Sequence, residues 1–359
     1  MKADSVDFLR RIVEAPSPSG FEWPVRKIVA ERMKGFCEDV RHDVMGNVIG
    51  VLNPGAKLRV MLAGHCDEIG MLITNITDDG YLYFGSIGGF DPTVLVSQRV
   101  WIHSEKGGEV PGVVGRKPIH LISREKDDIT KAPKLHELWL DIGAKDRKDA
   151  EKVVSVGDSV TIDAGFRELR NDIVAGRGFD DRVGAFAVAE TLRLLAAEPK
   201  RLKVAVYGVA TTQEELGLRG AHTSAYGIDP HAGIAIDLGF ASDYPTINKN
   251  ITGDVALGKG PIISRGANIN SVLGKMLVAA AKKNKIPYQV DGAPGATGTD
   301  ANIMQITRAG VAAALVSVPN RYMHTPVELV SLRDLDHTSE LLAATILGMK
   351  ETEDFIPMS

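Results

Sequence analysis

The sequence predicts an α/β protein, a three-layer α/β/α sandwich with a mostly parallel sheet, interrupted by an inserted β-barrel-like domain. Two observations predict this fold class. In residues 1–69 and 166–359, continuous runs of small and β-branched apolar residues alternate with amphipathic helical segments, which is typical of helices packed on both faces of a parallel sheet. Residues 70–165 instead carry short apolar stretches between frequent glycines, with almost no helical periodicity.

The α/β part can be assigned in chain order. Residues 5–14 form an apolar helical face, and a second helix is expected to run to about Met33, because Ser19 and Glu22 have the spacing of a capping box before it. A β-hairpin is expected over 39–52, with its turn at 45–47. Buried strands are expected over 58–64, 202–210, 232–238 and 311–319, and further helices over 180–195, 218–226, 271–283 and 331–350, with another starting at 298–300. The helix 271–283 is amphipathic, and its inward face is expected at Val272, Met276, Ala279 and Ala280.

The insertion is predicted to be a separate β-rich domain. Six short stretches have the pattern of antiparallel strands joined by polar turns: 71–76, 81–88, 99–104, 111–115, 138–143 and 158–164. One helix is expected at 146–154. The chain is therefore expected to consist of one α/β domain, 1–69 and 166–359, and one inserted domain, 70–165.

Composition and charge narrow the functional classes. The chain has 359 residues, 44% apolar and 25% charged, which suits two globular domains or one domain with a large insertion. Its net charge of −4 provides no broad basic field for nucleic acid or an anionic membrane. No run approaches the ~18 apolar residues of a membrane span, and the charged N-terminus lacks the apolar core of a signal peptide. With only two cysteines, Cys37 and Cys66, a cytoplasmic location is expected.

The residues that carry chemistry follow the predicted strands. The strand 202–210 is followed by Thr-Thr-Gln and then by two adjacent carboxylates, Glu214 and Glu215. In open α/β sheets, ligands and chemistry collect outside the carboxyl ends of the strands. Adjacent carboxylates there repel each other unless positive charge lies nearby. Imidazoles and carboxylates stand at strand ends, helix starts or loops of the other segments: His65, Asp67, Asp180, Asp237 and His324.

A metal site explains this set better than separate explanations of its parts. Alone, each part is ordinarily a buried histidine, a capped helix start or a solvated loop. Together, the segments place imidazole and carboxylate on one side of one predicted sheet, and zinc, cobalt and manganese use these ligands in hydrolytic sites. Two neutral histidines and three carboxylates contribute −3, so two divalent cations and a bridging hydroxide would make the site neutral. One cation would leave uncompensated negative charge in a partly buried place, which is costly.

Five motifs then identify a family resemblance. They are GHCDEIG at 64–70, GRGFDDRVG at 176–184, TTQEELGLRGA at 211–221, AIDLG at 235–239 and MHTPVE at 323–328. In this order they resemble the dinuclear metallo-aminopeptidases of the tetrahedral (TET) type, which include glutamyl aminopeptidases and some proteins named endoglucanase. The resemblance covers essentially the whole chain, and it implies a sandwich of the zinc-peptidase type.

The resemblance implies a role for each residue. His65 and Glu215 would each bind one metal, and Asp237 and His324 would bind the other. Either Asp180 or Asp181 could be taken as the bridge between the metals; the related enzymes, in which the peptide after the bridging aspartate is cis, favour Asp180. Glu214 would be the general base. Asp67 would hold His65 through its second ring nitrogen and fix its tautomer.

The implied function is a metal-dependent aminopeptidase that removes N-terminal residues from short peptides by attack of a metal-bridging hydroxide. The cofactors would be two divalent ions per subunit, zinc or cobalt, with manganese as a third candidate. Family members assemble as dodecamers through the inserted domain, so a homo-oligomer is expected. The main alternative is a metal-dependent deacylase of small N-acyl compounds, which a requirement for a free amine would exclude. Two further alternatives are a glycosidase, which would not need metal, and a non-catalytic assembly subunit, which would bind no metal.

Overall fold

The computed structural model describes residues 1–122 and 131–357. Residues 123–130, which fall in the expected insertion, and 358–359 lie outside the described residues. The chain divides into two compact units. The first comprises Met1–Glu68, Gly165–Met323 and Val327–Ser359, and the second comprises Ile69–Ala164 and His324–Pro326.

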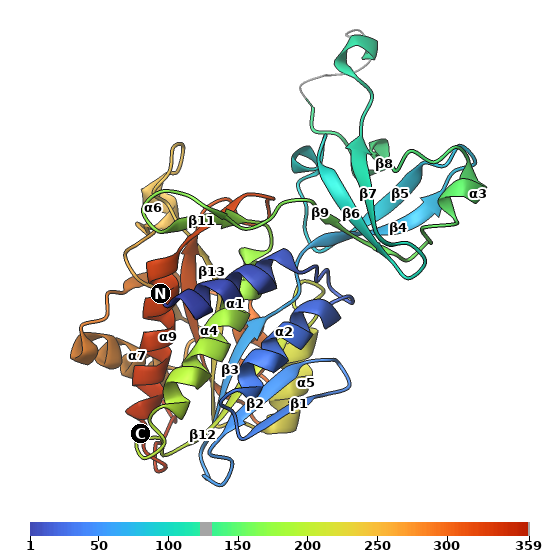
Figure 1. Ribbon diagram of the computed structural model, residues 1–359. Coiled ribbons are helices and arrows are strands. Elements are labelled where there is room, and N and C mark those ends of the chain that lie inside the picture. The colour runs from blue at the N-terminus through green and yellow to red at the C-terminus, as the bar shows by residue number, and fades with distance from the viewer. Residues whose placement is uncertain (123–130, 358–359) are drawn as a thin grey trace. The chain divides into compact units, whose positions relative to one another are not determined.

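The first unit is built on an eight-stranded sheet (Figure 1). Its strand order is β1-β2-β12-β3-β13-β16-β14-β15, and the central strands β12, β3, β13 and β16 run parallel. The strands are β1 (Asp39–His42), β2 (Val48–Leu52), β3 (Arg59–His65), β12 (Ala205–Thr211), β13 (Ala232–Phe240), β14 (Ile262–Gly266), β15 (Gln289–Ala293) and β16 (Ala312–Asn320). This mostly parallel sheet confirms the predicted fold class.

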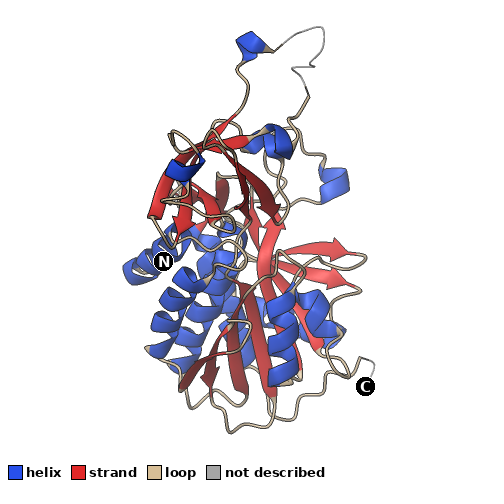
Figure 2. Ribbon diagram, turned by 90° about the vertical axis from the view of Figure 1, so that its right-hand side faces the viewer, coloured by secondary structure: helices blue, strands red, loops and turns tan. Residues whose placement is uncertain are grey.

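Helices cover both faces of this sheet (Figure 2). The alternation of side chains in β3 shows why: Val60 and Leu62 belong to one apolar core, and Met61 and Ala63 belong to another on the opposite face. The first core includes residues of α1 (Ala3–Glu14), α2 (Trp23–Lys34), α4 (Phe179–Ala196), α7 (Ser271–Asn284) and α9 (Leu332–Leu347). The second includes residues of α5 (Arg219–Ile228) and α8 (Asp300–Gln305). The result is the expected three-layer sandwich.

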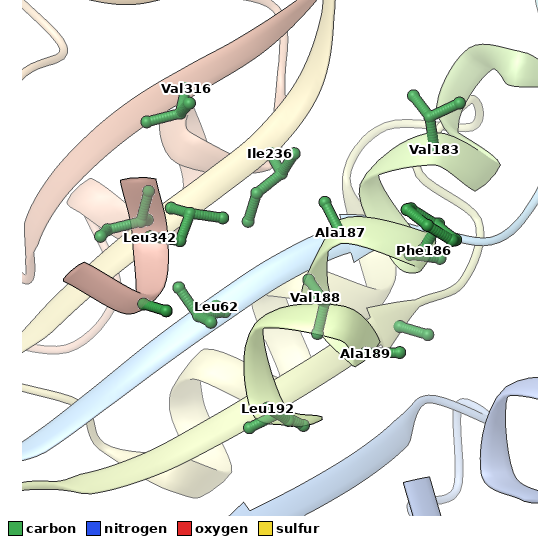
Figure 3. Close-up of a cluster of buried hydrophobic side chains, with 14 of the residues drawn as sticks. Leu62, Val183, Phe186, Ala187, Val188, Ala189, Leu192, Ile236, Val316 and Leu342 are labelled. Carbon is green, nitrogen blue, oxygen red and sulfur yellow. The ribbon is translucent and has the colours of Figure 1, made fainter. Parts of the chain in front are cut away.

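Helix α4 lies directly on the centre of the sheet. It packs against β3, β12, β13 and α9. Figure 3 shows this core, with labelled side chains from α4, from α9 and from three strands: Leu62, Val183, Phe186, Ala187, Val188, Ala189, Leu192, Ile236, Val316 and Leu342. At the end of β3 the two backbones touch, because a Cβ added to Gly64 would lie 2.3 Å from the carbonyl carbon of Gly184. Glycine is therefore required one residue before His65.

Replacing this glycine tests the close approach. Gly64→Ala is expected to reduce the free energy of unfolding by about 1–3 kcal/mol or more, because the new methyl group meets backbone rather than a side chain that could move aside. Gly55→Ala is the matched control, since a Cβ there meets nothing within 4 Å, and it should stay within about 0.5 kcal/mol of wild type. Urea unfolding measures both. Equal stability of the two variants would contradict the contact.

The start of α2 differs from the prediction. The helix begins at Trp23 with Glu22 at its N-cap, and no side chain caps it. The expected capping box is wrong because both of its residues have other partners. The Ser19 hydroxyl donates to Asp67, and the Glu22 carboxylate accepts the N–H of Gly20 at 2.7 Å. A tertiary contact has replaced the local one.

Several short elements of the first unit were not expected from the sequence. Strand β14 and the edge strand β15 were not expected, nor was a small sheet of β10 (Arg167–Glu168), β11 (Ile173–Gly176) and β17 (Glu328–Ser331). A four-residue helix, α6 (Lys249–Thr252), was also missed. These elements are short, so they give little periodicity to detect. Among the described residues, no helix is both long enough and apolar enough to cross a membrane.

The second unit is a closed barrel with strand order β4-β5-β8-β7-β6-β9. Neighbouring strands pair antiparallel around an apolar interior that includes Met71, Ile102 and Val160. The strands are β4 (Gly70–Ile76), β5 (Leu82–Ile87), β6 (Arg99–Ser104), β7 (Gly108–Gly115), β8 (Trp139–Asp141) and β9 (Ser159–Ile162). The helix expected at 146–154 is shorter, α3 (Arg147–Ala150). The barrel confirms the predicted β-barrel-like fold.

Candidate metal centre

The parallel strands bring the predicted residues to one edge of the sheet. His65 is the last residue of β3 and pairs with Thr211, the last residue of β12. On the other side of β3, Ala63 pairs with Ala235, so Asp237, two residues further along β13, lies level with His65. Asp237 was expected near the end of its strand, but β13 continues three residues beyond it, to Phe240. The shared register, not the strand end, places it at the site.

His65 lies at the centre of two groups of side chains that could each hold a metal ion. One group is His65, Asp180 and Glu215, and the other is His65, Asp181 and Asp237. In each group the ligand atoms lie within 4.8 Å of one another. All of these side chains are buried except that of Glu215, which is partly exposed. The nearest carboxylate oxygen to His65 Nε2 is Oδ1 of Asp180, at 3.2 Å.

The two adjacent aspartates of α4 have different surroundings. The peptide bond between Asp180 and Asp181 is cis, as the resemblance implied. Both carboxylate oxygens of Asp181 accept backbone N–H groups: Oδ1 accepts that of Gly184 at 3.0 Å, and Oδ2 accepts that of His65 at 3.2 Å. Asp181 therefore holds β3 against α4. Asp180 Oδ1 instead faces the imidazole of His65, and each of the two aspartates belongs to one of the two ligand groups.

The two glutamates lie in a turn rather than in a strand. Strand β12 ends at Thr211, so the alternation of side chains along a strand does not place Glu214 and Glu215 on opposite sides. After Gln213, which has a positive φ of 53°, the Glu214 carbonyl accepts the N–H groups of Gly217 and Leu218 and closes the turn. Glu215 is a member of a ligand group, and Glu214 is not. The Glu214 Oε2 atom is 3.8 Å from His65 Nε2.

Asp67 connects three of these residues. Its Oδ1 accepts the backbone N–H of Glu214 at 3.1 Å, and its Oδ2 accepts that of Glu215 at 3.3 Å. His65 Nδ1 is 3.0 Å from the Asp67 carbonyl oxygen and 3.5 Å from its carboxylate. A proton on Nδ1 is thus held by an acceptor, which leaves Nε2 to bind a metal.

His324 belongs to the second unit, unlike the other predicted ligands. The segment His324–Pro326 is grouped with the second unit, and His324 Nδ1 is 3.1 Å from the carbonyl oxygen of Gly89. Neither ligand group found among the described residues includes it. The four remaining predicted ligands, His65, Asp180, Glu215 and Asp237, all belong to the first unit.

The electrostatics of the cluster fit a bound cation. Burial and the neighbouring Asp237 carboxylate raise the pKa of Asp181 well above its usual range, and burial and Asp180 do the same to the pKa of Asp237. Burial raises the pKa of Glu214 to about 10 although His65 opposes it. Burial would lower the pKa of His65, but the carboxylates of Glu214, Asp180 and Asp67 outweigh burial and raise that pKa well above its usual range. These raised pKa values mean that the cluster favours bound protons, and a metal cation could supply the same positive charge. Imidazole and carboxylate are also the ligands that zinc, cobalt and manganese accept.

Sequence reasoning missed several residues around this cluster. Glu68 accepts hydrogen bonds from Arg177 and forms an ion pair with Arg182, and all three are buried. Asp300, also buried, accepts the Thr211 hydroxyl at 2.6 Å. The only signal for the first group was that Glu68, Arg177 and Arg182 all stand inside the motifs that carry the candidate ligands.

A sequence model of the M42 glutamyl aminopeptidase family matches residues 46–341. The lysyl aminopeptidase of Pyrococcus furiosus is 39% identical over 98% of this chain and 99% of its own. An aminopeptidase structure from Desulfurococcus kamchatkensis is 39% identical, with a TM-score of 0.89 over 97% of this chain and 96% of its own. The TET1 peptidase of Pyrococcus horikoshii, which can assemble into a tetrahedron or a large octahedral shell, is 32% identical, with a TM-score of 0.85 over 96% of this chain and 100% of its own.

Proposed function

Because the chain belongs to the M42 glutamyl aminopeptidase family, and is thereby an aminopeptidase, we propose that it is a dinuclear metal-dependent enzyme that removes N-terminal residues from short peptides. The observation that carries this proposal is the cluster around His65, in which four carboxylates gather about one imidazole and carry more negative charge than one divalent ion would neutralise. The raised pKa values of the Asp181 and Asp237 carboxyl groups support it, because nearby cations would offset the burial and the carboxylate repulsion that cause them.

Five residues would hold the two ions. We assign His65, Asp180, Glu215 and Asp237 from the cluster, with Asp180 as the bridge, and His324 from its place in the family motif. The ions would be zinc or cobalt, with manganese as a third candidate, since this mixture of imidazole and carboxylate suits all three. When bound, such a pair lowers the pKa of a shared water towards ~7 and polarises the substrate carbonyl.

Glu214 would be the general base. Its carboxylate lies beside the ligand groups without belonging to either, and its backbone is held by Asp67. It would accept the proton of the attacking water and return it to the leaving amine, a transfer that suits a carboxylate within hydrogen-bond reach of that water. Asp67 would contribute indirectly, by holding the His65 segment and the backbone of both glutamates.

Assembly and location are proposed from the relatives. The Pyrococcus horikoshii relative can assemble into a tetrahedron or a large octahedral shell, and we infer that this chain forms a homo-oligomer, a dodecamer, through the inserted residues 70–165. Enclosed active sites would admit short peptides and exclude folded proteins. We place the enzyme in the cytoplasm, where its two cysteines would stay reduced.

Hydrolysis of a panel of aminoacyl-nitroanilides tests the function. The purified protein is assayed as isolated, after chelation, and after addition of zinc, cobalt or manganese. We expect activity to fall by at least about 100-fold on chelation, to return with metal, and to vanish when the substrate amine is acetylated, because the reaction needs both the ions and a free N-terminus.

The panel also identifies the preferred side chain. Hydrolysis of acetylated substrates in preference to free amines would support the deacylase instead. A protein that hydrolyses nothing in any metal state, with its metals bound, would contradict the proposed aminopeptidase.

A further inference from the structure

The Asp67 carboxylate is fully buried and accepts three hydrogen bonds. Two come from the backbone of Glu214 and Glu215, at 3.1 and 3.3 Å. The third and shortest comes from the Ser19 hydroxyl, whose Oγ is 2.6 Å from Asp67 Oδ2. This distance is typical of a charge-assisted bond between a hydroxyl and a carboxylate. Ser19 thus makes the strongest single contact to the residue that holds both glutamates.

The turn that carries Ser19 is fastened to the segment that carries Asp67. Pro18 and Glu68 form a parallel β-bridge. The Ser19 N–H donates to the Glu68 carbonyl at 3.3 Å, and the Glu68 N–H donates to the Ser17 carbonyl at 2.9 Å. The Ser17 hydroxyl donates to the Cys66 carbonyl at 2.6 Å. Residues 17–19 therefore run alongside 66–68, and the Ser19 hydroxyl is held in front of the carboxylate.

A buried ionic group fixes this turn to α4. Arg182 donates to the Ser17 hydroxyl from Nε at 3.1 Å and from Nη2 at 3.0 Å, and it pairs with Glu68. Arg182 is fully buried and stands two residues after Asp180. The turn, the Asp67 segment and the start of α4 are therefore linked by side chains that solvent does not reach.

We propose that Ser19 is a positioning residue for the reaction, acting through Asp67 on the backbone of Glu214 and Glu215. This rests on the proposed function of those two glutamates. Ser19 is 6% exposed, so water has little room to replace its hydroxyl. Without that bond, Asp67 keeps only the two longer bonds to the backbone groups that it has to orient. Hydrogen-bond partners behind a metal site contribute about 10–100-fold to metal affinity or activity.

The test uses Ser19→Ala in the metal-loaded enzyme. We expect kcat to fall about 10–100-fold with KM nearly unchanged, and the dissociation constant for Co²⁺, used as the probe in equilibrium dialysis, to rise. Ser224→Ala is the matched control: Ser224 is also buried, and its hydroxyl donates only to carbonyls of its own helix, Gly220 and Ala221. Its kcat and Co²⁺ affinity should stay within about twofold of wild type.

A double-mutant cycle separates positioning from a general structural role. If Ser19 acts through Asp67, adding Ser19→Ala to Asp67→Ala, which leaves no acceptor for the hydroxyl, should cause no further loss of kcat or Co²⁺ affinity. Losses that multiply would overturn the proposal, as would a Ser19→Ala enzyme with wild-type kcat and Co²⁺ affinity. A wild-type protein without aminopeptidase activity would overturn the proposed function alone, because Co²⁺ affinity would still decide the role of Ser19.

Discussion

Glu214→Gln is expected to lower kcat by at least about 100-fold, the effect of removing a general base, while the protein keeps both metal ions. The amide has the size of the carboxylate but cannot accept the proton of the attacking water. Metal content should not change, because Glu214 belongs to neither ligand group. Nitroanilide hydrolysis gives kcat, and elemental analysis after gel filtration gives the metal content.

The neighbouring residue provides the control. Glu215 belongs to a ligand group with His65 and Asp180, so Glu215→Gln should lose metal together with activity. Near wild-type turnover in Glu214→Gln would show that the base is another residue. Loss of metal from Glu214→Gln would show that the two glutamates have exchanged roles.

Glu68→Gln is expected to reduce the free energy of unfolding by about 3–5 kcal/mol, the usual effect of removing one partner from a buried ion pair. The variant would leave the buried guanidinium groups of Arg177 and Arg182 facing a neutral amide. Glu31→Gln is the control, because Glu31 pairs with Arg11 at the surface with both side chains half exposed, and it should change stability by less than about 1 kcal/mol. Urea unfolding at equal metal content measures both.

The pH dependence gives a second check on Glu68. Burial would raise the pKa of its carboxyl group, but Arg177 and Arg182 outweigh burial and hold that pKa below its ordinary value of 4.5. A carboxylate with a lowered pKa stabilises the folded state above its ordinary pKa and loses that contribution as the pH falls through the folded value. The difference between wild type and Glu68→Gln should therefore be complete at pH 7 and shrink below about pH 4.5. A difference that grows with acid would contradict the ion pair.

The polar residues at the ends of buried strands could be predicted from the sequence, because they follow from local patterns. The apolar runs ending at His65 and before Glu214 indicated buried strands, and buried strands in an α/β protein run parallel. That rule alone was enough to bring His65 and the segment of Glu214 and Glu215 to one edge of the sheet. The register that sets Asp237 level with His65 was not predictable, because it depends on which residues pair across strands.

The surroundings of the site could not be predicted from the sequence, because they depend on contacts between distant segments. Ser19 and Glu22 have the spacing of a capping box, and nothing local reveals that Asp67 takes the hydroxyl. In α7 the inward face was expected at Val272, Met276, Ala279 and Ala280, but Leu273, Leu277 and Ala281 are the buried residues. The periodicity was correct, and the face was wrong by one position, because packing against α9, β14 and β16 selected the leucines.

The candidate ligands of the first unit come from four segments that are far apart in the chain: the end of β3, the start of α4, the turn after β12, and β13. An unfolded chain cannot present them together, so a cation bound there would favour the folded state alone. At a free concentration of 100 times its dissociation constant, such an ion adds about 2.7 kcal/mol to the free energy of unfolding. The same four segments that perform the chemistry would then make the metal supply of the cell a determinant of how long each copy of the enzyme survives.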